Sequence, residues 1–224
     1  MKTSLNILSL NYFGKNEKER YGSPIVDPNT KRLSKTFSEY LKDKDYRSFV
    51  FDILNLAKYY NEKIQNSGND LILYNQYTRL DFLKLVNWRN DKKNMANNIY
   101  GYRVLDEYIP LFITYHKSED IDDSIKYEDH FLNQEELAWV SRKNVSLKNK
   151  EINQIINHKE DGKTIYIFVK KNDSEGSQHY YLGEAEYMKG SANETTNVTE
   201  DKIVTMNFIM KTPIRDDIYR YLVN

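Results

Sequence analysis

The sequence predicts an α+β fold, with a mainly helical N-terminal part over residues 1–95 and a β-rich C-terminal part over residues 96–224. Between residues 34 and 66, apolar side chains recur at three- and four-residue steps, which is typical of amphipathic helices. Beyond residue 100 this spacing gives way to short segments rich in β-branched and aromatic residues, which are typical of half-buried strands.

The composition excludes several classes of protein. The chain has 224 residues, with 33 Lys plus Arg against 33 Asp plus Glu, and no cysteine. Without cysteine there are no disulfides, thiolate metal sites or cysteine nucleophiles. Zero net charge argues against coating of nucleic acid or anionic membrane by bulk charge alone. No apolar run approaches the roughly 20 residues that span a bilayer, and the start lacks a signal-peptide pattern. We therefore expect a soluble, cytoplasmic protein that makes no contact with membranes.

In the N-terminal part, the first apolar run predicts a strand or extended arm over Leu5–Phe13. The spacing from Ser34 onward predicts a pair of helices, broken near Lys42–Asp45 and ended by Asn66–Asn69. A shorter helix follows, because Thr78 can cap the apolar run that ends at Val86.

In the C-terminal part, the chain is expected to form five strands, a long insertion over residues 117–163, and two helices. The helices are expected at Glu151–Asn157, inside the insertion, and at Arg215–Leu222. The strands are expected at Gly101–Leu105, Pro110–His116, Thr164–Lys171, His179–Glu186 and Ile203–Met210.

Signatures of catalysis are absent from the sequence. There is no Gly-rich phosphate loop, no His-Glu-x-x-His and no Gly-x-Ser-x-Gly motif. The four histidines show no metal-ligand spacing. Glu184, Glu186 and Lys189 could be drawn into a nuclease-type cluster, but their spacing is generic. We expect a chain with no catalytic residues, no metal site and no cofactor.

Charge is strongly patterned along this neutral chain. Residues 118–136 contain eight Asp or Glu and one Lys, whereas residues 139–171 contain eight Lys or Arg and three Asp or Glu. Residues 79–103 carry six Lys or Arg against two Asp. Such blocks are either ordinary solvated surface or phosphate-binding stretches. The candidates for phosphate binding are Arg89, Lys92, Lys93, Arg142, Lys143 and Lys148.

Aromatic and polar residues are mixed within the long insertion. Tyr115, Tyr127, Phe131 and Trp139 fall in or beside it, and Asp129 and Ser141 lie among them. Two aromatic rings that stack on a flat heterocycle, with a carboxylate that accepts a bond from an exocyclic amine, form a pocket for a nucleobase. The alternative is that the aromatic rings anchor the insertion by packing while Asp129 caps a short helix.

Several motifs, taken in order, resemble a known family. They include Ile113–Lys117 (ITYHK), Tyr127–Asn133 (YEDHFLN), Phe168–Lys171 (FVKK), Tyr180–Glu184 (YYLGE) and Arg215–Tyr219 (RDDIY). This succession resembles the domain of unknown function at the C-terminus of bacterial helicase-nuclease proteins, in particular the target-recognition domain of SauUSI-like type IV restriction enzymes.

The resemblance implies an SRA-like (PUA-like) curved β-barrel on which the helical part packs. It also implies a non-catalytic domain of an ATP-dependent restriction enzyme for phage defence, with helicase and nuclease domains of the same polypeptide as partners. The expected ligand is double-stranded DNA that contains 5-methylcytosine, with 5-hydroxymethylcytosine as a second candidate.

The expected mechanism is base flipping without chemistry. Tyr115, Tyr127 and Trp139 are the candidates for stacking, Asp129 for reading the cytosine amine, and Ser141 for lining the pocket. Two other functions stay open: a protein-docking module of a helicase-nuclease that does not read DNA, and a metal-dependent nuclease.

Overall fold

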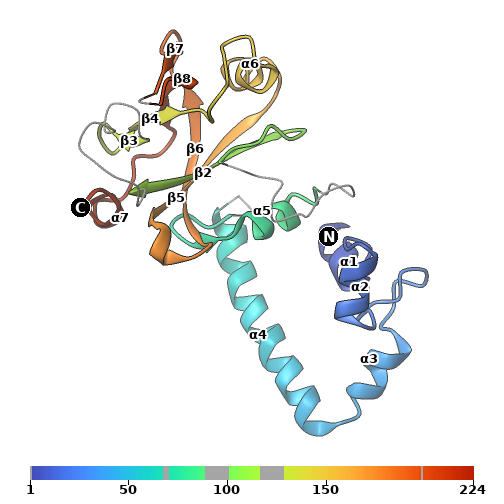
Figure 1. The fold of residues 1–224 in the computed structure, drawn as a ribbon. Helices are drawn as coiled ribbons and strands as arrows, with labels where there is room; N and C mark the ends of the chain where they lie inside the picture. Colours follow the sequence, from blue (N-terminus) through green and yellow to red (C-terminus); the bar gives the residue numbers. More distant parts are fainter. Residues whose placement is uncertain (1, 68–70, 89–100, 117–128, 198) are drawn as a thin grey trace. The chain divides into compact units, whose positions relative to one another are not determined.

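The computed structural model describes residues 2–67, 71–88, 101–116, 129–197 and 199–224. The chain divides into two compact units (Figure 1). The first comprises Met1–Ile72 and Leu80–Met95, and the second comprises Leu73–Arg79 and Ala96–Asn224. The expected boundary lay at residue 95. Residues 73–79 belong with the second unit because Gln76 and Tyr77 pair with a strand of its sheet.

The described part of the first unit is helical. Ser34 caps α3, since its side chain accepts a hydrogen bond from the Phe37 N–H at 3.2 Å, and Asp43 accepts one from the Tyr46 N–H at 2.8 Å at the start of α4. These two caps explain the predicted break between the helices, which is confirmed. The helices are α1 (Lys2–Leu8), α2 (Lys15–Tyr21), α3 (Lys35–Tyr40), α4 (Lys44–Ser67) and α5 (Arg79–Leu85).

The expectation of a strand or extended arm at Leu5–Phe13 is wrong, because this run begins inside α1 and ends in turns. Tyr12 is buried there, and its hydroxyl donates a hydrogen bond to the Trp88 carbonyl at 2.8 Å. A short apolar run is compatible with either helix or strand. The contact between Tyr12 and Trp88 joins residues 76 apart, so it could not be read from the spacing within the run. None of the described helices is long and apolar enough to cross a bilayer.

The second unit is built on one sheet of eight strands in its described residues. The strand order is β2-β5-β6-β8-β4-β3, with β1 paired to β6 and β7 paired to β8. Strands β2 and β5 are parallel, and the other pairs are antiparallel. The strands are β1 (Gln76–Tyr77), β2 (Tyr108–His116), β3 (His130–Phe131), β4 (Glu136–Val140), β5 (Thr164–Asn172), β6 (His179–Tyr187), β7 (Asn193–Thr196) and β8 (Lys202–Met210).

Most of the expected elements of this unit are confirmed. The expected helices correspond to α6 (Lys150–Ile156) and α7 (Asp216–Val223), and a 3-10 turn, η3 (Asp173–Glu175), follows β5. The expected strand at Gly101–Leu105 is instead represented by an isolated bridge between Tyr102 and Leu111. Residues 130–140, expected within an insertion, supply β3 and β4 to the sheet.

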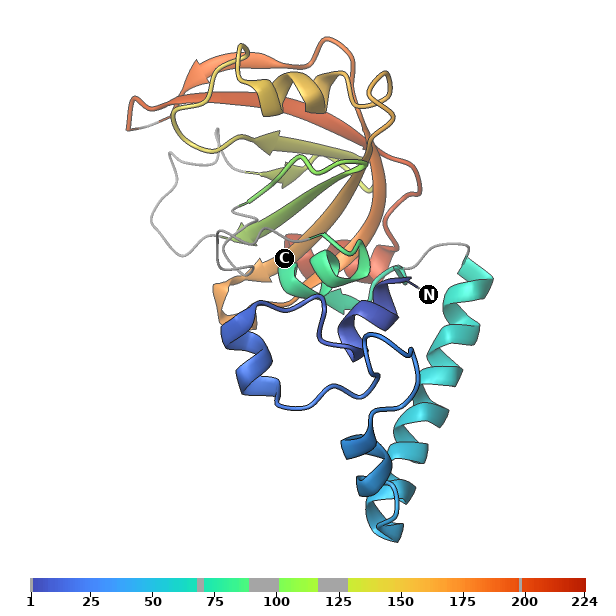
Figure 2. The same ribbon diagram turned by 90° about the vertical axis from the view of Figure 1, so that its right-hand side faces the viewer.

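The sheet is curved and open, which confirms the α+β class (Figure 2). Its register shifts between Ile167 and Phe168, opposite Gly183. Gly183 has a φ of +114°, and a side chain there would approach Leu73 Cδ2 at 3.2 Å, so only glycine fits without strain. Hydrogen bonding does not close a barrel in the described residues, because β2 and β3 are the two ends of the strand order.

Candidate nucleic-acid interface

The two edge strands of the sheet meet through an aromatic pair. The rings of Tyr115 in β2 and Phe131 in β3 are stacked, with centroids 5.7 Å apart and an interplanar angle of 13°. The Phe131 N–H also donates a long hydrogen bond of 3.4 Å to the Tyr115 hydroxyl. We call this contact the edge seam. It follows that the sheet curves until its edges touch, although β2 and β3 share no ladder of backbone hydrogen bonds in the described residues.

A buried carboxylate lies beside the edge seam. Asp129 immediately precedes β3 and is 6% exposed. Its Oδ1 accepts a hydrogen bond from the Val140 N–H of β4 at 2.9 Å. This bond fixes the orientation of the carboxylate, which has about four acceptor sites in all. The start of β3 therefore carries a buried carboxylate two residues before the Phe131 ring of the edge seam.

Tyr115 is partly exposed, whereas Phe131 is buried. Burial raises the pKa of the Tyr115 hydroxyl, so it stays protonated and can donate a hydrogen bond at physiological pH. Tyr219 of α7 packs edge-on against Phe131, with centroids 6.1 Å apart. The Phe131 ring thus supports Tyr115 from the core side and leaves Tyr115 as the more accessible ring of the pair.

Trp139 does not occupy the position expected for a base-stacking residue. It is 3% exposed and packs edge-on against Tyr102 and Phe208, with centroid distances of 5.0 and 5.8 Å. The pairing of Trp139 with Met206 in β8 directs this side chain into the core. Its ring faces are therefore covered, and the structure supports the packing alternative for this residue.

Ser141 also has a structural role in this arrangement. Its Oγ accepts a hydrogen bond from the Val204 N–H at 2.9 Å and donates one to the Arg142 carbonyl at 3.0 Å. The bond from Val204, together with the bond from the Ser141 N–H to the Val204 carbonyl at 2.8 Å, extends the contact between β4 and β8 beyond the last ladder pair. The Ser141 hydroxyl is therefore engaged with backbone groups, and the expectation that it lines a base pocket is not supported by its position.

The basic residues that follow β4 are mostly paired within the protein. The Arg142 guanidinium lies 4.2 Å from the centroid of the Tyr102 ring and forms an ion pair with Glu151. Burial acts to lower the pKa of Arg142, but Tyr102 and Glu151 outweigh it and raise the pKa above its ordinary value. Arg142 is thus a permanently charged group that joins β4 to α6, with its charge already balanced.

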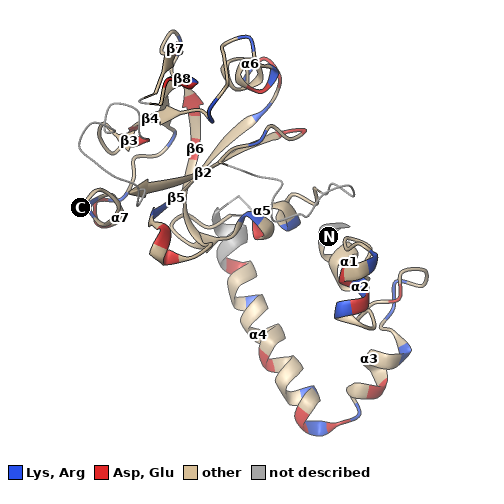
Figure 3. Cartoon of the chain, in the orientation of Figure 1, with Lys and Arg blue, Asp and Glu red and all other residues tan. Residues whose placement is uncertain are grey.

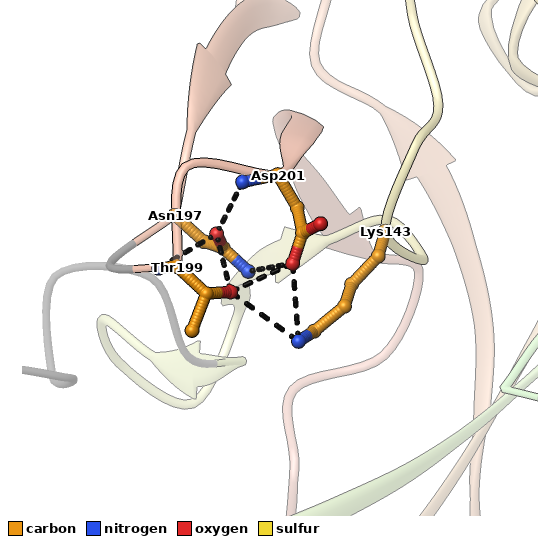
Figure 4. Close-up of polar contacts among 4 residues, drawn as sticks. All are labelled: Lys143, Asn197, Thr199 and Asp201. Carbon is orange, nitrogen blue, oxygen red and sulfur yellow. Dashed lines mark hydrogen bonds and ion pairs between the residues drawn. The ribbon is translucent and has the colours of Figure 1, made fainter.

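Lys143 belongs to an exposed polar cluster with the loop before β8 (Figure 4). Its Nζ lies 3.1 Å from Asp201 Oδ2 and 3.3 Å from Thr199 Oγ1, and Asn197 Oδ1 accepts hydrogen bonds from the Thr199 and Asp201 N–H groups. Hydrogen bonds from Thr199 and Lys143 hold the pKa of the Asp201 carboxyl below its ordinary value. Lys148 is exposed on the loop before α6 and keeps its place as a candidate for phosphate contact.

Four of the expected site residues fall outside the described residues: Tyr127, Arg89, Lys92 and Lys93. Glu184 and Glu186 are engaged with lysines, at 2.7 Å to Lys211 and 2.6 Å to Lys159. Within the described ranges, no group of three or more His, Asp or Glu side chains is arranged to hold a metal ion.

Tyr102 and Glu151 contribute to this region but were not among the predicted residues. Burial raises the pKa of the Tyr102 hydroxyl, and the Tyr102 ring separates Trp139 from the Arg142 guanidinium. An isolated Tyr after a glycine carries no sequence signal for such a contact. Glu151 follows Arg142 by nine residues, and only the start of α6 at Lys150 brings the two side chains together.

Comparison with known proteins identifies two family models along the chain. The model described as "Domain of unknown function (DUF3427)" matches residues 71–222, and the one described as "Domain of unknown function (DUF8090)" matches residues 1–66. No curated protein matches the sequence at a significant level.

Among solved structures, similar chains include three proteins of low identity. The SUVH5 SRA domain in complex with hemi-methylated CG DNA is 10% identical, with a TM-score of 0.43 over 66% of this chain and 93% of that chain. The DNA modification-dependent restriction endonuclease AspBHI is 12% identical, with a TM-score of 0.42 over 69% of this chain and 81% of that chain. SUVH6 of Arabidopsis thaliana, in complex with SAM, is 11% identical, with a TM-score of 0.41 over 68% of this chain and 31% of that chain.

Proposed function

The chain belongs to the DUF3427 family, and we propose that it is a DNA-binding module that reads modified cytosine in duplex DNA. The finer form of this proposal is that 5-methylcytosine is recognised after it has rotated out of the duplex, with 5-hydroxymethylcytosine as a second candidate ligand.

The observation that carries the proposal is the edge seam with its carboxylate. Tyr115 offers a partly exposed aromatic ring held in place by Phe131, and the buried Asp129 carboxylate lies at the start of the adjoining strand. Stacking of a base on an aromatic ring contributes roughly 1–3 kcal/mol. An ionised carboxylate accepts a hydrogen bond from the cytosine exocyclic amine and cannot do so from the carbonyl of thymine. The pair therefore has the chemistry to select cytosine.

Recognition of the methyl group would depend on shape. Burial of one methyl group is worth only about 0.8 kcal/mol, so discrimination by this term alone amounts to a few-fold in affinity. Extrusion of the base costs a few kcal/mol, which stacking and hydrogen bonding must offset. We therefore expect a modest methyl preference unless the methyl subsite is closely fitted.

Phosphate contacts would supply affinity without sequence information. Lys148 is exposed, whereas Arg142 and Lys143 would have to exchange their bonds to Glu151 and Asp201 for bonds to phosphate. Exposed ion pairs such as that of Lys143 contribute about 0–1 kcal/mol, so DNA can displace them at little cost.

The wider setting proposed for this module is a SauUSI-like, ATP-dependent type IV restriction enzyme. Helicase and nuclease domains of the same polypeptide would act on the DNA, and this chain would supply target recognition without catalysis. The resemblance of the motifs between Ile113 and Tyr219 to that family supports this setting.

An equilibrium titration tests the proposal with three duplexes that are identical except for one unmodified, methylated or hydroxymethylated cytosine. Tighter binding to a modified duplex than to the unmodified one is the expected result. Equal affinity for all three would refute modified-base reading, and no binding at all would favour the protein-docking function. Magnesium added to the same samples tests for nuclease activity, for which no cleavage is expected.

A further inference from the structure

Helix α4 carries a large apolar surface that the described residues leave uncovered. Seven large apolar side chains between Phe49 and Tyr60 are each 45–62% exposed. Five of the seven, all except Phe51 and Tyr59, lie on one side of the helix. At about 200 Å² per side chain, half exposed, these five present on the order of 500 Å², so two copies would bury about 1,000 Å² in total, the size from which a specific interface is expected. A single soluble copy rarely leaves such an area in water. The seven residues are Phe49, Phe51, Ile53, Leu54, Leu56, Tyr59 and Tyr60.

The spacing along α4 matches a helix that pairs with another helix. Tyr46, Val50, Ile53, Ala57 and Tyr60 are separated by alternating steps of four and three residues. This spacing is typical of the contact face of a helix that packs against another helix along its length. Lys58 and Asp52 lie off this contact face, and Figure 3 shows that most of α4 carries neither basic nor acidic side chains.

The two halves of α4 are complementary. The first half, including Val50 and Ile53, lines an apolar groove of about 620 Å³ together with Leu8, Leu33 and Phe37 from earlier in the chain. The second half, from Leu56 to Tyr60, is exposed and does not line this groove. One chain therefore presents both an apolar groove and an apolar helical segment that fits such a groove.

We propose that this face binds a second copy of the chain, through antiparallel pairing of the two α4 helices about a twofold axis at Asn55. That axis sets Val50 opposite the partner's Tyr60 and Ile53 opposite the partner's Ala57. The apolar contact face of each helix is therefore covered by the contact face of the other. Leu54 and Leu56 flank the axis, and each lies next to its own copy. The second half of each helix then lies along the groove of the other chain, as a twofold interface requires.

The charges favour a second copy over a membrane surface. Along its whole length α4 carries Lys44, Arg47, Lys58 and Lys63 against Asp45, Asp52 and Glu62. An interfacial membrane helix concentrates basic residues on its polar face, whereas α4 has nearly as many acidic residues as basic ones. Between Val50 and Tyr60 the charged residues are Asp52 and Lys58, and this register sets Asp52 level with the partner's Lys58, which has the opposite charge. The pairing is therefore not opposed by repulsion.

The test combines mass measurement with cross-linking on the whole 224-residue chain. Light scattering on a sizing column is expected to give twice the mass of 26.7 kDa at a protein concentration of about 100 µM. Replacement of both leucines (Leu54→Asp and Leu56→Asp) buries like charges at the axis, and we expect it to weaken dimerisation at least about 100-fold. Ser48→Asp, on the opposite side of the helix, is the matched control and is expected to stay dimeric.

Because the chain has no cysteine, a single introduced cysteine can form a disulfide only with the same position in a second copy. Leu54→Cys is expected to form a disulfide-linked dimer under mild oxidation, whereas Ser48→Cys is not. Circular dichroism shows whether each variant keeps its helix content. A monomeric wild-type chain, a dimer insensitive to the leucine replacements, or equal cross-linking of both cysteine variants would each overturn the proposal. DNA binding is not involved in these measurements, so the outcome is independent of the proposed function.

Discussion

Tyr115 and Phe131 stack at 5.7 Å although their strands stand at opposite ends of the strand order of the sheet. The contact joins the two edges by side chains, where a closed barrel would use backbone hydrogen bonds. The two edges are thus held by a ring stack and one long hydrogen bond. This relationship makes the seam both a structural closure and the candidate site for a base.

Removal of the buried ring should therefore open the seam. Phe131→Ala is expected to lower the free energy of unfolding by about 3–5 kcal/mol, because a buried phenyl group is lost and a cavity remains. In a double-mutant cycle with Tyr115→Ala, the coupling energy is expected to be about 0.5–1.5 kcal/mol, the value of a favourable aromatic pair. Chemical denaturation measures both quantities, and a coupling energy near zero would show that the stack does not hold the edges together.

Asp129→Asn distinguishes an effect on base recognition from an effect on stability better than Asp129→Ala does. The amide oxygen can still accept the Val140 N–H, whereas alanine leaves that N–H without this acceptor, at a cost of about 1–3 kcal/mol. With asparagine we expect near-normal stability but roughly tenfold weaker binding of the methylated duplex, since a charge-assisted hydrogen bond is lost. Asp161→Asn, at an exposed loop position, is the control. Full affinity in a stable Asp129→Asn protein would remove this carboxylate from the base site.

Trp139 is expected to affect stability and not methyl preference. Trp139→Ala should lower the free energy of unfolding by about 3–5 kcal/mol, because the ring is enclosed by Tyr102 and Phe208. The smaller change Trp139→Phe should yield a folded protein whose affinities for methylated and unmethylated duplexes keep the wild-type ratio. A changed ratio in that protein would return Trp139 to the base site.

His179 predicts how stability depends on pH. Burial, together with the positive charges of Arg79 and Lys170, lowers the pKa of His179 to about 4. Unfolded chains protonate histidine near pH 6.5, so between about pH 6.5 and 4 the unfolded state binds one more proton than the folded state. Stability is therefore fully present above pH 6.5 and falls as the pH decreases to 4, by at most about 3 kcal/mol.

His179→Gln should remove this part of the pH dependence. Denaturation of the wild type and the variant at pH 7, 5.5 and 4 measures it, and parallel curves for the two proteins would contradict the assignment. His158→Gln is a useful comparison, because the ring of His158 lies between the Lys163 carbonyl and the Tyr187 N–H, as a structural histidine does.

The sequence was sufficient to predict elements whose periodicity is local. The break between α3 and α4 follows from nearby caps, and strands β5, β6 and β8 are long and rich in β-branched and aromatic residues. Strands β3 and β4 fall within the predicted insertion because they are short, and because β8, the strand that pairs with β4, lies about 70 residues away. Leu137 and Trp139 do alternate with half-buried neighbours, so the period of two is present but brief.

The residue types of the candidate site were predictable from the sequence, but their positions in space were not. That Tyr115 and Asp129 lie in or before the two end strands of the sheet was not predictable, and the direction of the Trp139 side chain depends on the register of β4 against β8. Whether Arg142 is available depends likewise on α6, which brings Glu151 to it. Such contacts between distant segments carry no signal in the spacing of a single sequence.

A crystal structure of the chain with a duplex that carries one 5-methylcytosine tests the central claim most directly. We expect the methylated base outside the duplex, with its ring against Tyr115 and its exocyclic amine within hydrogen-bond distance of Asp129. A methylated base that stays stacked in the duplex, or that binds away from the edge seam, would contradict this account.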